Sequence, residues 1–106
     1  MLEKSLSHSL AIYLALDGDA IVGLVRLVRD GFSLVFVQDL IVLPCYQRQG
    51  IGSALMKEAL GDFKDAYQVQ LETDQTDKTL EFYRSLGFET LSTYDYTGMI
   101  WADRKE

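Results

Sequence analysis

Seven consecutive residues near the middle of the chain point most directly to a chemical role. They read Gln47-Arg48-Gln49-Gly50-Ile51-Gly52-Ser53 and hold two glycines separated by one residue. Glycine lets the backbone turn tightly and approach a ligand closely. A strand pattern precedes the stretch and a helical pattern follows it, so unpaired N–H groups and the positive end of a helix dipole are expected here. These features predict an anion site, with a pyrophosphate as its natural occupant.

Other phosphate-binding loops fit this stretch less well. The dinucleotide fingerprint needs glycines at positions where this chain lacks them, and no Gly-Lys-Ser/Thr ending marks a nucleoside triphosphate loop. Two glycines before a helix can also serve only to shape a tight strand-to-helix turn. The glycine spacing by itself therefore leaves both an anion site and a structural turn open.

Strands are expected on the N-terminal side of the loop. Residues 11–16 and 20–28 are rich in Ile, Val, Leu and Tyr, and the Asp-Gly-Asp between them predicts a hairpin. Asp30-Gly31 repeats the turn signal. Residues 33–43 are apolar on both alternating faces, which predicts a central strand covered on two sides and leaves Asp39 as a carboxylate that needs a reason.

Helical spacing begins after the loop. Apolar residues recur at helical intervals from Gly50, and Gly61 stands where a left-handed cap would end this helix. A second helix fits residues 77–86, with Asp74 or Thr76 able to cap it.

Strands are also expected on the C-terminal side. Residues 67–73, 88–94 and 99–102 each predict a strand, and Gly87-Phe88 ends the second helix with a hydrophobic contact. Antiparallel hairpins come first and a helix crossover follows. This order predicts an α/β (α+β) fold, in which helices pack on one mixed, mostly antiparallel sheet.

Composition limits the class of protein. The chain has 106 residues, of which 48% are hydrophobic and 25% charged, and this predicts one domain over residues 1–106. A net charge of −6 with scattered basic residues argues against nucleic acid as a partner and favours cationic ligands. No apolar run approaches the roughly 18 residues of a membrane span. With no leader pattern and a single cysteine, a cytoplasmic location is expected.

Two blocks of the sequence resemble the GNAT family of N-acetyltransferases. In the first, which runs from Val42-Leu43-Pro44 through residues 46–55, the family signature is Gln or Arg, two residues, Gly, one residue, then Gly or Ala. Gln47, Gly50 and Gly52 meet it. The second block, residues 82–88, follows at the expected spacing, and the resemblance covers roughly residues 11–101.

The resemblance implies acetyl-coenzyme A as the cosubstrate, and no metal. Its pantetheine arm would lie between the central strand and the next strand, where the two splay apart. The strand residues that would offer backbone groups to it and to the acetyl carbonyl are Leu40, Ile41 and Val42. The loop residues that would hold the phosphates are Gln47, Arg48, Gln49, Gly50, Ile51, Gly52 and Ser53.

The implied reaction is direct attack of a primary amine on the thioester. Tyr83 stands at the place of the family's general acid, and a phenol can give a proton to the departing thiolate. A protonated amine also needs a base, for which Asp39 and Glu72 are candidates. Each of the three can instead be structural or solvated. No basic residue adjoins Cys45, so it is not expected to be a nucleophile.

Members of the family usually begin with a further strand and one or two helices, which this chain lacks, so a truncated fold is implied. Residues 1–10 would then form only the tail of the last of those helices, with Leu2, Leu6 and Leu10 on one face. The first strand and an apolar sheet face would then be exposed unless a second copy covers them, which predicts a homodimer. Thr76 and Thr79 stand where many relatives carry Asn and Ala. A small-molecule amine is the expected acceptor. The alternative function is a non-catalytic acyl-coenzyme-A-binding module, or a subunit that needs a partner chain to complete the acceptor site.

Overall fold

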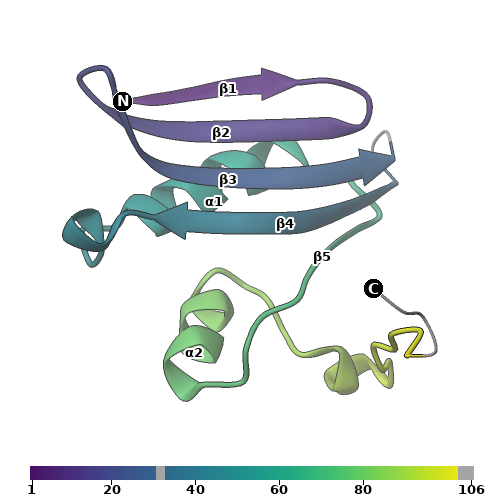
Figure 1. Cartoon of the computed structure of the whole chain (residues 1–106). Coiled ribbons are helices and arrows are strands. Elements are labelled where there is room, and N and C mark those ends of the chain that lie inside the picture. Colours follow the sequence, from purple (N-terminus) through teal and green to yellow (C-terminus); the bar gives the residue numbers. More distant parts are fainter. Residues whose placement is uncertain (31–32, 103–106) are drawn as a thin grey trace. The chain divides into compact units, whose positions relative to one another are not determined.

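The computed structural model describes residues 1–30 and 33–102 (Figure 1). The chain divides into two compact units, Met1–Thr73 and Asp74–Glu106, and each is described by itself. The first unit contains the sheet and the longer helix, and the second contains the shorter helix. The predicted turn at Gly31 lies outside the described residues.

One sheet with the order β1-β2-β3-β4-β5 forms the first unit. Its strands are β1 Leu2–Leu6, β2 Leu10–Asp17, β3 Ala20–Asp30, β4 Leu34–Val42 and β5 Gln68–Leu71. Strands β1 to β4 pair antiparallel, and β5 runs parallel to β4. The predicted mixed, mostly antiparallel sheet is therefore confirmed. So is the first hairpin, in whose turn Gly18 has a φ of 61°.

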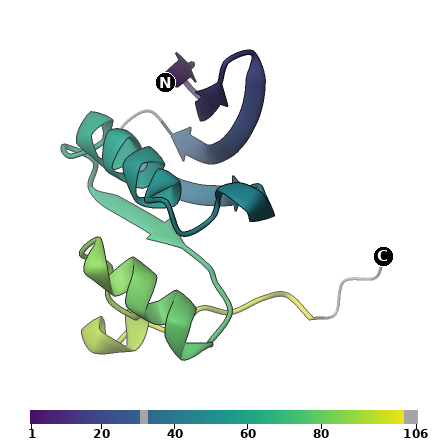
Figure 2. The same ribbon diagram turned by 90° about the vertical axis from the view of Figure 1, so that its left-hand side faces the viewer.

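Helix α1, Ile51–Asp62, packs on β2, β3 and β4 and lies on one face of the sheet (Figure 2). Burial of apolar side chains between this helix and the sheet is the main stabilising contribution. The buried apolar residues are Ala11, Tyr13, Ala15, Val22, Val25, Leu27, Val35, Val37, Leu55, Met56, Ala59 and Phe63. The prediction that β4 is covered on both faces was wrong, because Leu34 and Ile41 are 51% and 56% exposed.

Side chains of helix α1 pack closely over Gly23 of β3. A Cβ atom at this position would lie 3.0 Å from Ile51 Cγ2 and 3.1 Å from Leu55 Cδ1. Both neighbours belong to the first two turns of α1, and Leu55 is fully buried. The missing side chain of Gly23 therefore fixes how near the start of α1 can lie to the sheet.

We expect Gly23→Val to destabilise the protein by about 1–3 kcal/mol, because its methyl groups would overpack the space beneath α1. Urea unfolding measures this change. Gly61→Ala is the matched control, because a Cβ there meets no atom within 4 Å and Gly61 lies inside the same helix. Alanine should stabilise that site by about 0.5–1 kcal/mol. A Gly23→Val protein as stable as the wild type would contradict the close approach.

The N-terminal residues form strand β1, so the predicted helix tail was wrong. Leu2 lies opposite Ala15 of β2, and Leu6 lies opposite Ala11. Spacing of leucines by four is compatible with a helix, but the edge of β2 offers a row of unpaired backbone groups that only a strand can satisfy. Strand β1 also covers the edge of β2 that was expected to be exposed.

A side-chain cluster joins β1 and β2 to the end of α1. Lys4 Nζ lies 2.9 Å from Asp62 Oδ2, and the buried Tyr13 donates its hydroxyl hydrogen to the same oxygen at 2.7 Å. The hydrogen bonds from Lys4 and Tyr13 lower the pKa of Asp62 below its ordinary value. Burial, with the hydrogen bond to Asp62, raises the pKa of Tyr13. The cluster therefore fixes the last turn of α1 against the sheet.

Helix α1 runs past the glycine that was expected to cap it. The left-handed glycines are Gly18, Gly50 and Gly87, and Gly61 is not among them. The helix continues to Asp62, and Phe63 follows as its C-cap residue with a 1% exposed side chain. Burial of Phe63 against the sheet outweighs the poor helix propensity of Gly61.

In the second unit, helix α2 spans Asp77–Ser85, close to the predicted 77–86. Thr76 is its N-cap residue, and Thr76 Oγ1 accepts a hydrogen bond from the backbone N–H of Thr79 at 3.4 Å. Asp74 in turn accepts from the backbone N–H of Thr76 at 3.1 Å. Neither of the two α-helices in the described part of the chain is long and apolar enough to cross a membrane.

The predicted end of α2 is confirmed. Gly87 has a φ of 100°, and the Phe88 backbone N–H donates to the Tyr83 carbonyl at 3.1 Å. The Tyr83 and Phe88 rings also meet edge to face, with centroids 5.9 Å apart. This is the glycine-terminated ending in which a left-handed residue satisfies the last carbonyl groups of a helix.

The two strands predicted after Phe88 are absent from the described residues. A 3-10 helix, Leu91–Tyr94, replaces the first, and residues 95–102 are irregular and exposed. Thr90 Oγ1 lies 3.2 Å from both Ser92 Oγ and Thr93 Oγ1, and the Thr93 N–H donates to the Thr90 carbonyl. These local hydrogen bonds satisfy groups that a strand would need a neighbouring strand to satisfy.

Candidate functional site

The loop between β4 and α1 is held in an uncommon backbone conformation. It opens with a 3-10 turn, Pro44–Tyr46, and reaches α1 through Arg48 and Gly50, whose φ angles are 66° and 82°. Gly50 adopts this left-handed conformation at no steric cost. For Arg48 it costs about 1–2 kcal/mol, a strain that tends to persist at functional sites. The glycine spacing predicted a tight turn at Gly50, but nothing in the sequence indicated the left-handed conformation of Arg48.

The first turn of α1 is open to an anion. Gly50 is the N-cap residue, and it has no side chain with which to cap the N–H groups of Ile51, Gly52 and Ser53. A Cβ atom at Gly50 would meet nothing within 4 Å, so the space next to it is free. Unpaired N–H groups and the positive end of the helix dipole can therefore act together on a phosphate.

Side-chain hydrogen bonds hold the loop in shape. Gln47 Nε2 donates to the Val42 carbonyl at 2.9 Å, and Gln49 Nε2 donates to the Cys45 carbonyl at 3.4 Å. Tyr46 donates its hydroxyl hydrogen to Asp17 Oδ2 at 2.6 Å, and this bond raises the pKa of Tyr46. The two glutamines thus use side-chain donors within the loop, although they were predicted to contact phosphate.

A cavity of about 530 Å³ adjoins the loop on the side of β2. Gly50, Ile51 and Gln49 line it from the loop, and Ala15, Leu16 and Asp17 line it from β2. The start of α1 is therefore bordered by a hollow within the first unit.

The second feature of the site is an unpaired edge of β4. Pairing with β5 ends where Val37 lies opposite Leu71, and residues 38–42 of β4 continue without β5 beside them. On its other edge β4 stays paired with β3 as far as Val42. The two parallel strands therefore part in the direction of the loop, as the resemblance implied.

The hydrogen bonds between β3 and β4 indicate which backbone groups of β4 point to this unpaired edge. The Leu43 N–H donates to the Val22 carbonyl of β3 at 2.9 Å. Because backbone groups alternate between the two edges of a strand, those of Ile41 also point to β3, and those of Leu40 and Val42 point to the open edge. The Val42 carbonyl accepts from Gln47, so we expect Leu40 to offer the free groups there.

The two candidate bases lie on the two strands that part. Asp39 belongs to β4, where its carboxylate pairs with Arg26 of β3. Glu72 is exposed and directly follows β5, which puts it next in register after the pair of Val37 and Leu71. Both residues therefore lie on the chain where the pairing of β4 with β5 ends, and the pairing of Asp39 with Arg26 was not predicted.

Tyr83 belongs to the second unit. It lies on α2, half-buried, with its ring centroid 5.0 Å from that of Phe82. Burial, aided by the negative charge of Asp74, raises the pKa of Tyr83 above its ordinary value. The phenol therefore remains protonated at neutral pH.

The remaining predicted residues have simple surroundings. Cys45 is exposed and His8 is exposed. Across residues 1–30 and 33–102, no three His, Cys, Asp or Glu side chains are grouped so that they could hold a metal ion.

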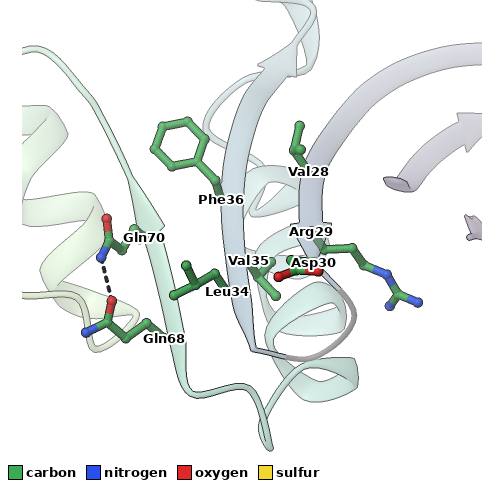
Figure 3. A pocket seen from close by; sticks show the side chains of 8 residues that line it. All are labelled: Val28, Arg29, Asp30, Leu34, Val35, Phe36, Gln68 and Gln70. Carbon is green, nitrogen blue, oxygen red and sulfur yellow. Dashed lines mark hydrogen bonds between the residues drawn. The ribbon is translucent and has the colours of Figure 1, made fainter. Parts of the chain in front are cut away.

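A second cavity, of about 340 Å³, lies at the opposite end of β4 (Figure 3). Its polar lining includes Gln68 and Gln70, whose side chains are joined by a hydrogen bond of 2.7 Å. Leu34 and Phe36 of β4 also line it. None of the residues that the sequence singled out for chemistry belongs to this cavity.

Comparison with protein families finds a match to the acetyltransferase (GNAT) domain, which covers residues 8–90. Among curated proteins, the chain is 32% identical over 83 residues to a soybean (Glycine max) protein named histone acetyltransferase TAP1. That alignment covers 76% of this chain and 35% of the soybean protein. This chain thus spans about a third of that relative.

Two further similarities concern an enzyme and a solved structure. A glucosamine 6-phosphate N-acetyltransferase of Trypanosoma brucei brucei is 34% identical over 65 residues, which cover 59% of this chain and 43% of that protein. A GNAT family acetyltransferase from Streptococcus pneumoniae TIGR4 is 78% identical with a TM-score of 0.86. The latter match covers 94% of this chain and 76% of that one.

Proposed function

Because this chain belongs to the GNAT acetyltransferase family, we propose that it transfers an acetyl group from acetyl-coenzyme A to a primary amine by direct attack. The observation that carries the proposal is the continuity of two features. The open edge of β4 leads directly into a loop that ends at the uncapped start of α1. The anion site at the start of α1 suits the diphosphate of the coenzyme, and the unpaired edge of β4 suits the amides of its pantetheine arm.

The loop residues suit the diphosphate. Backbone N–H groups of Ile51, Gly52 and Ser53 can donate to its oxygens without the help of many basic side chains. Arg48 adds one positive charge. In a chain with a net charge of −6, binding through backbone donors avoids the need for a basic patch.

The edge of β4 suits the amide chain and the acyl group. Acetyl-coenzyme A supplies the acetyl group as a thioester. Leu40 and Val42 can hydrogen-bond the pantetheine amides as a neighbouring strand would, while Ile41 gives its side chain to the exposed sheet face. The Leu40 N–H is our proposed donor to the acetyl carbonyl oxygen, where negative charge develops during attack.

Proton transfer is assigned to three side chains. Asp39 or Glu72 accepts a proton from the ammonium group of the acceptor, directly or through water, so that the neutral amine can attack the thioester carbon. Tyr83 donates a proton to the departing sulfur, a role that suits a phenol which burial keeps protonated. These assignments extend the family's chemistry to matching positions of this chain.

For the acceptor we propose a small, cationic primary amine. The net charge of −6 attracts cationic molecules. The trypanosomal relative is named for glucosamine 6-phosphate, which supports a small molecule with a primary amine but not its positive net charge. A homodimer and a cytoplasmic location remain predictions. Apolar residues of the sheet face away from α1, among them Val28 and Ile41, are exposed in the single chain and offer area for a second copy.

Two measurements test the proposal together. Acetyl-coenzyme A at about 100 times its dissociation constant should stabilise the protein by about 2.7 kcal/mol, which a thermal shift records. Thiol release should then follow when amines are added. Coenzyme binding without thiol release across a broad amine panel would favour the non-catalytic module. A flat thermal shift would contradict both functions.

A further inference from the structure

A charged pair interrupts the sheet face that turns away from α1. Arg26 alternates with the buried Val25 and Leu27, so its side chain points to the other face of β3. Asp39 lies directly opposite Arg26 on β4. Their side chains are 44% and 36% exposed. An ion pair this exposed contributes little to stability, so its presence among apolar neighbours calls for another reason.

A β-bulge turns Asp39 toward this face. Leu27 pairs with Val37, but the next residue of β3, Arg26, pairs with Asp39, so Gln38 is an extra residue in β4. Without it, regular alternation from Val37 would turn Asp39 to the buried face under α1. Bulges commonly re-aim a side chain in this way beside active sites. The bulge also resolves why a carboxylate is tolerated in an otherwise apolar strand.

Arg26 holds only one of the two carboxylate oxygens. Arg26 Nε donates to Asp39 Oδ2 at 2.9 Å, and Nη2 lies 2.7 Å from the same oxygen. Two contacts from one planar guanidinium fix the orientation of the carboxylate. Within the described part of the chain no hydrogen bond is made to Asp39 Oδ1. That oxygen can therefore accept from a ligand.

Asp39 also adjoins the place proposed for the acyl group. Leu40 follows it directly, and the backbone groups of Leu40 point to the open edge of β4. We propose that Arg26 is a positioning residue, which fixes Asp39 so that Oδ1 receives the amino group of the acceptor. This inference rests on the proposed function and adds a determinant for amine recognition. A primary ammonium is the chemistry that fits, because it offers several N–H donors and a positive charge.

Steady-state kinetics of four proteins test the proposal: wild type, Arg26→Gln, Arg26→Lys and Asp39→Asn. The probe is whichever of glucosamine 6-phosphate, spermidine and Nα-acetyllysine gives the fastest thiol release with the wild type. Arg26→Gln should raise KM for that amine at least tenfold and leave the dissociation constant of acetyl-coenzyme A within twofold. Arg26→Lys should recover part of the loss, because one ammonium replaces two guanidinium contacts.

A double variant separates positioning from structural damage. If Arg26 acts through Asp39, Arg26→Gln combined with Asp39→Asn should raise KM no further than Asp39→Asn alone. Damage to the fold would instead lower kcat through a smaller active fraction and leave KM unchanged. Lys4→Gln is the control, since it removes an ion-paired cation of β1 and should leave KM unaltered.

The outcomes distinguish this inference from the function on which it rests. Wild-type protein that releases no thiol with any of the three amines or across the broad amine panel would overturn both. Active wild type with an unchanged KM in Arg26→Gln, or additive effects in the double variant, would overturn the positioning role alone. If Arg26→Gln does not fold, Arg26→Lys carries the test, and its KM must lie above that of the wild type.

Discussion

Gly50→Asp is expected to abolish acetyl-coenzyme A binding. The new carboxylate would stand at the N-cap of α1, in the free space that the structure leaves beside Gly50. Two like charges about 4 Å apart repel by about 4 kcal/mol at the effective dielectric constant of a protein surface. That repulsion corresponds to a loss of about a thousandfold in affinity, which isothermal titration calorimetry can measure.

Gly50→Asn is the matched control for this prediction. Asparagine has nearly the same size as aspartate, and both residues are among the side chains that best tolerate the left-handed φ of 82° found here. Backbone strain is therefore similar in the two variants, and only the charge differs. Asparagine should retain affinity within about tenfold of the wild type, a difference of about 1.4 kcal/mol. Equal affinities of the two variants would mean that no anion occupies this position.

The second large effect is expected from Tyr83→Phe, which should lower kcat by about 10²- to 10⁴-fold. Phenylalanine keeps the edge-to-face contacts with Phe82 and Phe88, so α2 should remain folded. The dissociation constant of acetyl-coenzyme A should not change, because only the proton donor is removed. Single-turnover and steady-state thiol release measure the loss. Tyr67→Phe, at an exposed tyrosine before β5, should behave as wild type.

The pH dependence gives an independent test of the same role. Because burial raises the pKa of Tyr83 above the ordinary value of a phenol, its hydroxyl keeps its proton as pH rises through neutrality. The wild-type rate should therefore rise with pH as the amine loses its proton, with no decline below about pH 9. A decline that begins near pH 8 and persists in Tyr83→Phe would assign the acid to another group.

Local sequence signals predicted the elements that need only local interactions. The hairpin at Gly18, the cap at Thr76 and the stop at Gly87 each depend on a few neighbouring residues, and each is present. The predicted helix tail at residues 1–10 failed because β1 forms through contacts with β2 and with Asp62, far along the chain. Spacing within ten residues cannot report such partners.

The other errors of the fold prediction have two different causes. Gly61 has the residue type of a helix cap, but burial of Phe63 two positions later extends α1 past it. Residues 88–94 have strand-like composition, yet hydroxyl and backbone hydrogen bonds around Thr90 form a 3-10 helix instead. In both cases an interaction outside the pattern was stronger than the propensity inside it.

The sequence predicted where the loop before α1 lies, but it did not predict the partner of Asp39. The glycine spacing located the start of α1, since a left-handed residue there must be glycine or pay a steric penalty. The partner of Asp39 could not be predicted, because Arg26 is thirteen residues away and reaches it only through the bulge at Gln38. A bulge depends on register, which no single strand encodes.

The hydrogen bond from Gln47 to the Val42 carbonyl bears on the GNAT signature itself. At this signature position, Gln47 Nε2 donates to the Val42 carbonyl at 2.9 Å, where β4 ends and the loop begins. An arginine could form the same hydrogen bond, because a guanidinium N–H can replace the amide N–H as donor. In this chain, the residue at this signature position therefore joins the end of β4 to the loop that follows it through a neutral side-chain donor.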